Sequence, residues 1–240
     1  MALLAVEELR AQFGGIVALS DLSFEADLGQ ICALIGPNGA GKTTLFNCIS
    51  RLYEPRSGRI TFDRQNLLAL PPHGIARAGI ARTFQNLALF PALTVLDNVL
   101  VGGYSHKGAA GKRRAEALEI LDRLSLAHLA DHRATGLPYG TLKRVEIARA
   151  MAAKQRMLLL DEPAAGLTHS EVDELSGLVR SLRDDLALTV LLVEHHMTMV
   201  MSISDKIVVL DFGSKIAEGT PAEVRENPRV IEAYLGTPAS

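Results

Sequence analysis

The chain alternates between short, unbroken apolar runs and longer stretches in which apolar residues recur at helical spacing. The unbroken runs are Ile31–Ile35, Met157–Leu160, Thr189–Val193 and Lys206–Leu210. Short runs of this kind are typical of central parallel strands that helices cover on both faces. We therefore expect these four runs to form the middle of one sheet.

Between the second and third runs, apolar residues recur every three or four positions. This stripe comprises Val172, Leu175, Val179, Leu182 and Leu186. Such spacing predicts an amphipathic helix, and Thr168 and Glu171 have the spacing of a capping box at its start. The alternation of strands and helices predicts a doubly wound α/β sheet.

Residues 87–151 differ because their pattern is mostly helical and no convincing strand interrupts it. The apolar positions form one face with Ala117, Ile120, Leu121 and Leu124, and another with Leu142, Val145, Ala148 and Ala152. Thr94 and Asp97 predict a helix start. We expect one domain over residues 1–240. It has an inserted helical subdomain (87–151) between two parts of the core (1–86 and 152–240), and residues 5–27 and 58–63 contribute strands to a smaller antiparallel layer.

The composition fits a folded protein that reaches membranes only through partners. Hydrophobic residues make up 48% of the 240 residues, enough for a substantial core. No apolar run approaches the roughly 20 residues that span a bilayer, so we expect a cytosolic protein. The net charge of −2 argues against a nucleic-acid partner. Cys32 and Cys48 lack metal-ligand spacing, which favours a buried, reduced pair.

A glycine-rich segment directly follows the first apolar run. It consists of Gly36, Pro37, Asn38, Gly39, Ala40, Gly41, Lys42, Thr43 and Thr44. Its glycines allow the backbone N–H groups to face phosphate oxygens, and a following helix adds partial positive charge. Lys42 would reach the β- and γ-phosphates, the Thr43 hydroxyl would bind Mg²⁺, and Thr44 could donate to the α-phosphate. Kinases, GTPases and transport ATPases share this site, so it does not by itself define the reaction.

Two adjacent carboxylates, Asp161 and Glu162, follow the second apolar run. An aspartate at the end of such a strand would hold Mg²⁺ through water. Glu162 is placed to polarise an attacking water as a general base. The alternative is a pair of acidic residues that simply begins a loop, which is common at strand ends.

The order of the motifs along the chain resembles the ABC ATPase family. Besides the phosphate loop and the acidic pair, it contains Gln85 within Arg82–Asn86, a signature segment at Leu137–Met151, and His195. The resemblance spans nearly the entire chain. It implies a P-loop NTPase (RecA-like) core with a small antiparallel β-subdomain and an inserted α-helical subdomain, the ABC ATPase fold, with ATP and Mg²⁺ as ligands.

The resemblance also implies roles for single residues. Phe13 would stack on adenine, although it could instead be a core residue of the small subdomain. Gln85 would contact Mg²⁺ and the attacking water and link the nucleotide to the helical insertion. His195 would contact the γ-phosphate, although it could instead be a satisfied histidine at a strand end. Residues 163–167 would form the D-loop between two active sites.

The signature segment implies a second ATPase subunit. Here Tyr139, Gly140 and Thr141 stand in the segment where the family usually has Leu-Ser-Gly-Gly-Gln. Backbone N–H groups around Gly140, at a helix expected to begin near Thr141, would bind the γ-phosphate held by the other subunit. ATP would then join two subunits, and hydrolysis would release them.

Several segments are similar to one ATPase subunit of the branched-chain amino acid importers. They are Tyr139–Gly140, Gly79–Asn86, Asp161–Leu167, Ala217–Pro221 and Val230–Gly236. This branch implies a heterodimer, with a homodimer as the alternative in isolation. It also implies two permease subunits, a substrate-binding protein and a position on the cytoplasmic face of the membrane. An apolar patch at Leu87, Leu89 and Phe90 is the expected docking surface.

Four residues depart from the branch pattern. Leu142 replaces a polar residue, His196 replaces an aspartate, and Arg51 and Arg64 replace glycines. The main alternative function is a lipid-exporting ABC ATPase, which would share Glu146–Arg149. A soluble ABC ATPase acting on DNA or ribosomes would carry duplicated cassettes or long insertions, and a P-loop kinase would not need the signature helix. The transported substrate cannot be read from this chain, because other subunits contact it.

Overall fold

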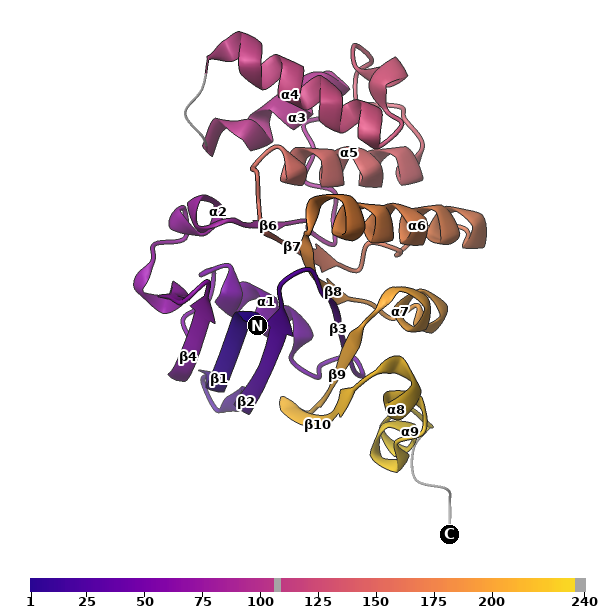
Figure 1. Cartoon of the computed structure of the whole chain (residues 1–240). Helices are drawn as coiled ribbons and strands as arrows, with labels where there is room; N and C mark the ends of the chain where they lie inside the picture. Colours follow the sequence, from indigo (N-terminus) through magenta and orange to yellow (C-terminus); the bar gives the residue numbers. More distant parts are fainter. Residues whose placement is uncertain (106–108, 236–240) are drawn as a thin grey trace.

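The computed structural model describes residues 1–105 and 109–235, and Gly236 of the C-terminal motif lies outside them. Its centre is a six-stranded sheet in the order β10-β9-β3-β8-β7-β6 (Figure 1). These strands are β3 (Ile31–Ile35), β6 (Ile80–Arg82), β7 (Met157–Asp161), β8 (Thr189–Val193), β9 (Lys206–Asp211) and β10 (Ser214–Gly219). All neighbours are parallel except β9 and β10. The four predicted central strands are confirmed.

A second sheet is antiparallel, in the order β2-β1-β4-β5. It consists of β1 (Ala2–Phe13), β2 (Ile16–Asp27), β4 (Ser57–Phe62) and β5 (Gln65–Asn66). Helix α1 (Lys42–Ile49) follows β3, and its Phe46 is fully buried in the core that joins the two sheets. The predicted antiparallel layer is therefore confirmed.

The inserted region contains the helices α3 (Val95–Gly102), α4 (Ala110–Arg123) and α5 (Tyr139–Met151), with short 3₁₀ turns η2 (Gly103–Ser105) and η3 (Ala127–Leu129). Thr94 caps α3 by accepting the Asp97 N–H at 3.0 Å, as predicted. Within the described residues of this region, strand pairing is limited to one bridge between Thr94 and Arg133. The boundaries drawn for the subdomain remain a prediction.

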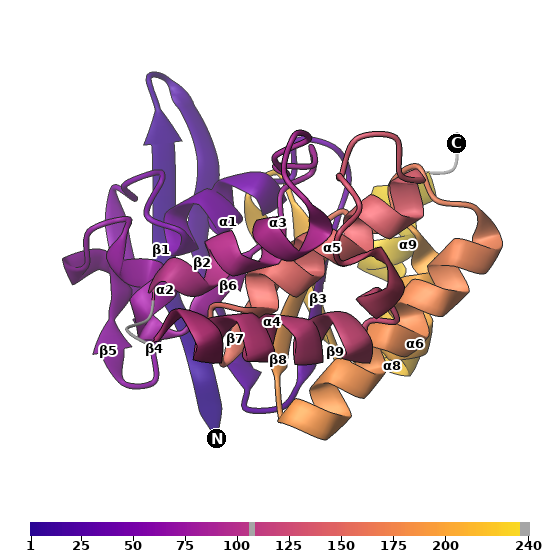
Figure 2. The same ribbon diagram turned by 90° about the horizontal axis from the view of Figure 1, so that it is seen from above.

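The remaining helices complete the layers. They are η1 (Leu67–Ala69), α2 (Gly74–Ala78), α6 (His169–Leu186), α7 (Met197–Ile203), α8 (Pro221–Arg225) and α9 (Pro228–Leu235). The antiparallel sheet and α6 lie on opposite sides of the central sheet in both views (Figures 1 and 2). The capping box of Thr168 and Glu171 is present. The predicted helix is confirmed; four residues of its apolar stripe are buried, and Leu186, its last residue, is 44% exposed.

The apolar run of strand β7 does not alternate with polar residues because the strand is covered on both faces. Met157 and Leu159 belong to the core shared with the antiparallel sheet, whereas Leu158 and Leu160 belong to the core under α5 and α6. Because both faces are covered, the positions from Met157 to Leu160 are all apolar.

Cys32 and Cys48 are free and buried, as predicted. None of the helices in the described part of the chain has the length and apolar character needed to cross a membrane.

Candidate nucleotide-binding site

The glycine-rich segment turns sharply between β3 and α1, and two of its glycines are required there. Gly36 has φ 151°, and a Cβ at this residue would lie 2.1 Å from the carbonyl oxygen of Leu210. Gly41 has φ 102°, and a Cβ there would lie 2.6 Å from the carbonyl oxygen of Ala18. Only glycine fits such a close approach. The loop can therefore curl tightly before α1.

Lys42 lies inside this loop with only 6% of its surface exposed. Its Nζ donates hydrogen bonds to the carbonyl oxygens of Gly36 at 2.7 Å and Pro37 at 2.9 Å. Burial lowers the pKa of Lys42, and the carboxylates of Glu162 and Asp161 oppose that shift. An ammonium group has three donors, so the two carbonyl bonds leave one for a phosphate oxygen.

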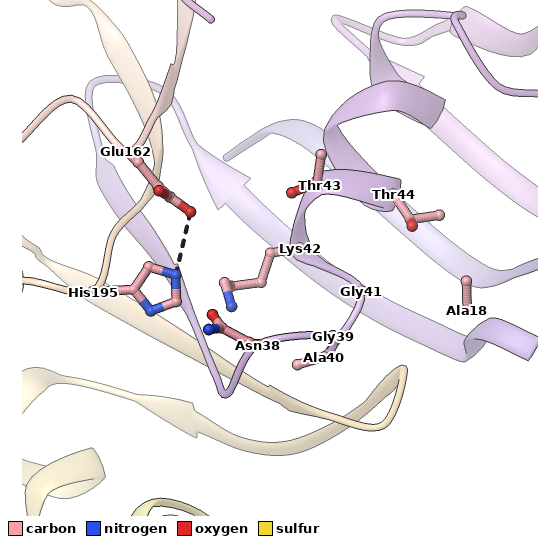
Figure 3. Close-up of a pocket in the computed structure, with 10 residues that line it drawn as sticks. All are labelled: Ala18, Asn38, Gly39, Ala40, Gly41, Lys42, Thr43, Thr44, Glu162 and His195. Atoms are coloured by element: carbon pink, nitrogen blue, oxygen red, sulfur yellow. Dashed lines mark ion pairs between the residues drawn. The ribbon is translucent and has the colours of Figure 1, made fainter. Parts of the chain in front are cut away.

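A pocket opens above the loop (Figure 3). It is lined by Ala18, Asn38, Gly39, Ala40, Gly41, Lys42, Thr43, Thr44, Glu162 and His195. Lys42, Thr43 and Thr44 form the first turn of α1, where backbone N–H groups have no partner within the helix. The pocket thus combines N–H donors, a cation and the partial positive end of a helix, which suits a phosphate.

Glu162 is held at the edge of this pocket in a strained backbone conformation. Its φ is 47°, a left-handed value that is uncommon for a non-glycine residue. Its Oε2 accepts a hydrogen bond from Gln85 Nε2 at 2.7 Å, and its Oε1 lies 3.3 Å from His195 Nε2. The structure therefore brings together three residues that lie on different loops of the sequence.

Thr43, Gln85 and Asp161 line a neighbouring opening together with Arg82. A hydroxyl, an amide and a carboxylate supply the oxygen ligands that Mg²⁺ prefers. These residues fit a magnesium site, and the oxygens of a bound nucleotide would complete it. Asp161 is 4% exposed.

Arg82 is a further residue of the site that sequence reasoning missed. Its Nη2 donates to Asp161 Oδ2 at 2.7 Å, and its Nη1 donates to Asn47 Oδ1 at 2.8 Å. The guanidinium lies 5.4 Å from the ring centre of Phe46 and 5.2 Å from that of Phe84. It thus joins α1, the end of β7 and the segment containing Gln85. The position of Arg82 three residues before Gln85 was the only available signal.

Glu194 was also missed, although it directly precedes His195. Its buried carboxylate accepts the backbone N–H groups of Ala164 at 2.6 Å, His195 at 2.8 Å and His196 at 3.0 Å. It therefore fixes the loop after Glu162 and the loop carrying His195 relative to each other. An acidic residue at the end of a buried strand was the signal that could have found it.

Phe13 lies at the end of β1 and is 43% exposed. Its ring contacts Tyr53 edge-on, with the ring centres 4.9 Å apart. The alternative role as a core phenylalanine is therefore wrong. Its stacking on adenine remains a prediction.

The signature residues do not line the pocket formed by the chain's own phosphate loop. Helix α5 begins at Tyr139, earlier than the predicted start near Thr141, and Pro138 is its N-cap. The N–H groups of its first turn thus belong to Tyr139, Gly140 and Thr141. Tyr139 is 41% exposed, whereas Gly140 is buried beside the Glu171 carboxylate.

The four departures from the branch pattern differ in their surroundings. Leu142 is half-buried in the first turns of α5. Among the described residues, the buried Nδ1 of His196 has no hydrogen-bond partner, and its ring lies 5.9 Å from that of His169. Arg51 and Arg64 have φ values of 59° and 66°. Glycine adopts such angles without strain, which explains why it suits these two positions.

The fold and the site define a cassette ATPase that binds a nucleotide at the carboxyl edge of its parallel strands. Residues 19–165 match the family model described as ABC transporter. Residues 214–240 match the model described as branched-chain amino acid ATP-binding cassette transporter. The chain belongs to the ABC transporter family of ATP-binding subunits, and within it to the branched-chain amino acid branch.

Individual relatives agree with this membership. The chain is 44% identical to the high-affinity branched-chain amino acid transport ATP-binding protein BraF of Pseudomonas aeruginosa, over 98% of both chains. It is 34% identical to the lipopolysaccharide export system ATP-binding protein LptB of Escherichia coli, again over 98% of both. The lipid-exporting relative is thus the more distant of the two.

Solved structures show the same fold. A nucleotide-free ATP-binding cassette from an ABC transporter superposes with a TM-score of 0.90 at 31% identity, covering 99% of this chain and all of the other. A dimeric bacterial ABC transporter cassette gives a TM-score of 0.82 at 27% identity, covering 91% of this chain and 98% of the other. The predicted ABC ATPase fold is confirmed.

Proposed function

We propose that this chain is the motor subunit of an importer that carries branched-chain or related amino acids across the cytoplasmic membrane. The convergence of Lys42, Thr43, Glu162 and His195 in one pocket carries the motor assignment. The substrate class rests on the similarity to BraF, a branched-chain amino acid transport ATP-binding protein. The subunit would work on the cytoplasmic face of the membrane, held there by its partners.

Within this proposal, each side chain of the site has one task. Lys42 neutralises the β- and γ-phosphates of ATP, and the first-turn N–H groups of α1 orient them. Thr43, Gln85 and, through water, Asp161 hold Mg²⁺, which stabilises the charge that develops on the phosphates. Glu162 accepts a proton from the attacking water. His195 contacts the γ-phosphate.

The start of α5 would act on the nucleotide that a second ATPase subunit binds. The N–H groups of its first turn lie outside the chain's own pocket, which supports a role in closing the pocket of a neighbouring subunit. A phosphate at this helix start would be stabilised by the helix dipole. We expect a heterodimer of ATPase subunits in the complex, with a homodimer as the alternative in isolation.

A groove between the central sheet and the helical insertion suits the permease subunits. Its lining is largely apolar and includes Ile75, Phe84, Phe90, Val101 and Ala150. Phe90 is 47% exposed. Leu87 and Leu89 are half-buried and Leu89 packs against the core under α5, so the expectation of an exposed patch is wrong for these two residues. Exposed apolar surface beside a functional loop is typical of a protein interface.

Phe90→Glu is expected to prevent assembly with the permease subunits while ATP binding is unchanged. A charge in the groove would have to be buried without a partner, which costs several kcal/mol. Copurification with the two permeases, together with ATP binding by the isolated subunit, measures both effects. Leu186→Glu is the matched control, since Leu186 is 44% exposed at the end of α6. Normal assembly of Phe90→Glu would remove the groove from the proposal.

Deletion of the gene in its own host is expected to abolish high-affinity uptake of labelled leucine, isoleucine and valine. The wild-type gene should restore uptake, and a gene encoding Lys42→Ala should not. Unchanged uptake would exclude the amino-acid importer. If the deletion instead left lipopolysaccharide in the inner membrane, the lipid-exporting alternative suggested by LptB would be favoured.

A further inference from the structure

One face of α5 carries three charged residues, of which Lys143 and Glu146 are buried and Arg149 is partly buried. Lys143, Glu146 and Arg149 are spaced by three positions, which places them along the same side of the helix. Lys143 is 3% exposed and Glu146 is 1% exposed. Such residues are almost never buried without partners. Their partners should therefore show what this face does.

All three side chains contact the backbone of residues 84–88, the segment that carries Gln85. Glu146 Oε1 accepts the N–H of Phe84 at 3.1 Å, and Lys143 Nζ donates to the Gln85 carbonyl oxygen at 3.3 Å. Arg149 Nη1 donates to the Ala88 carbonyl oxygen. Arg149 Nη2 also lies 3.8 Å from Glu146 Oε1, which ties the charges to one another.

Residues 84–88 contain no helix or strand that could fix their backbone. On either side, Thr83 N–H bonds to the Leu159 carbonyl of β7, and Phe90 N–H bonds to the Asn98 side chain of α3. Between these anchors, α5 supplies the contacts described above. Burial raises the pKa of Glu146, and the Phe84 N–H and the two cations oppose that rise.

The same segment controls the side chain that touches Glu162. Gln85 Nε2 donates to Glu162 Oε2 at 2.7 Å, and this bond requires the backbone at Gln85 to be correctly placed. A continuous set of contacts therefore runs from Glu146 through the Phe84 N–H and the Gln85 side chain to Glu162. The first turn of the same helix carries Gly140.

We propose that Glu146, together with Lys143 and Arg149, is a positioning residue that sets residues 84–88 so that Gln85 reaches Glu162. Through these contacts, a movement at the start of α5 would change the position of Gln85 relative to Glu162 in the same chain. The coupling to movement of α5 rests on the proposed function, in which Gly140 closes the nucleotide pocket of a neighbouring subunit. The positioning role of Glu146 does not depend on it, because those contacts lie within one chain.

The test compares Glu146→Ala and Glu146→Gln with Arg144→Gln. Arg144 lies on the same helix, but its Nη2 donates to Glu174 Oε2 of α6 at 2.7 Å and it has no described contact with residues 84–88. In the nucleotide-free protein, hydrogen exchange at the Phe84 amide should become about tenfold faster in Glu146→Ala, because a hydrogen bond to a buried carboxylate is lost. Arg144→Gln should exchange at the wild-type rate.

ATP hydrolysis supplies the second readout. The kcat of Glu146→Ala should fall about ten- to hundredfold through misplacement of Gln85, while the ATP affinity stays within about twofold of wild type because the phosphate loop is untouched. Unchanged exchange at Phe84, or a parallel loss of kcat and ATP affinity, would overturn the proposal. If the proposed function were wrong, the wild-type protein would not hydrolyse ATP, but hydrogen exchange at Phe84 would still be faster in Glu146→Ala than in the wild type.

Glu146→Gln keeps the test decisive if the alanine variant does not fold. Its amide oxygen can still accept the Phe84 N–H, but it no longer balances Lys143 and Arg149. Exchange at Phe84 should therefore rise less than in Glu146→Ala, and kcat should fall about two- to fivefold, as expected for a weakened rather than a lost hydrogen bond. A kcat equal to that of wild type in this variant would also contradict the proposal.

Discussion

Lys42→Ala is expected to weaken ATP binding by about a hundredfold or more. Lys42 Nζ is held inside the phosphate loop by two carbonyl oxygens, so it is already positioned before a nucleotide arrives. Without it, the phosphates would meet Asp161 and Glu162 with no cation from the loop to balance them. A charge-assisted hydrogen bond contributes about 1.5–3 kcal/mol, and the loss of the one donor left for a phosphate, together with the unbalanced carboxylates, corresponds to this change in affinity.

Titration with a fluorescent ATP analogue measures the effect. Lys154→Ala is the control, because Lys154 is an exposed lysine that pairs with Glu116, far from the loop in sequence. The variant protein should be checked by thermal unfolding, since the carbonyl oxygens of Gly36 and Pro37 lose their donor. A folded Lys42→Ala protein that binds ATP as wild type does would refute the phosphate site.

Glu162→Gln is expected to bind ATP normally and to reduce its hydrolysis about a hundred- to ten-thousandfold, the usual contribution of a general base. Glutamine has the shape of glutamate but cannot take the proton of the attacking water. The contacts of Glu162 with Gln85 and His195 show that its carboxylate is already aimed at the pocket. The ATP-bound dimer should accumulate, because hydrolysis no longer releases it.

Size-exclusion chromatography with ATP and Mg²⁺ detects the trapped dimer, alone or with the second ATPase subunit. Glu174→Gln serves as a control, because this exposed carboxylate pairs with Arg144 away from the pocket. Two results would count against the proposal. Hydrolysis at the wild-type rate would show that Glu162 is not the general base. ATP binding without any dimer would show that α5 does not close the pocket of a neighbouring subunit.

The chemistry of the individual loops could be predicted because it depends on neighbouring residues. Gly36 and Gly41 permit the positive φ angles of the tight turn, which is a local property of glycine, and Lys42 follows them at the start of a helix. The capping box of Thr168 and Glu171 is local in the same way. Gln85 and His195 were found through the resemblance to a family, because a single glutamine or histidine has no spacing that identifies its role.

The start of α5 and the docking surface were predicted less well. Pro138 can serve as an N-cap, so the helix begins at Tyr139, although the residues alone suggested a start near Thr141. Leu87, Leu89 and Phe90 were expected to form an exposed patch, but Leu87 and Leu89 are half-buried, Leu89 packs against the core under α5, and only Phe90 is exposed. The start of α5 thus follows from its own neighbour Pro138, whereas the burial of Leu89 depends on helices that lie elsewhere in the chain.

The sequence by itself determined the four central strands, the antiparallel layer, the helices of the insertion, the helix α6 and the phosphate loop, since apolar runs and glycine conformations act over a few residues. Only the tertiary structure decided which side chains support the site. Arg82 bonds to Asp161 across 79 positions, Glu146 to Phe84 across 62, and Glu194 to Ala164 across 30. These contacts exist because β6, β7 and β8 are adjacent in the sheet and α5 packs beside them. A buried charge selects its partner from what folding brings within hydrogen-bond distance, and sequence spacing does not contain that information.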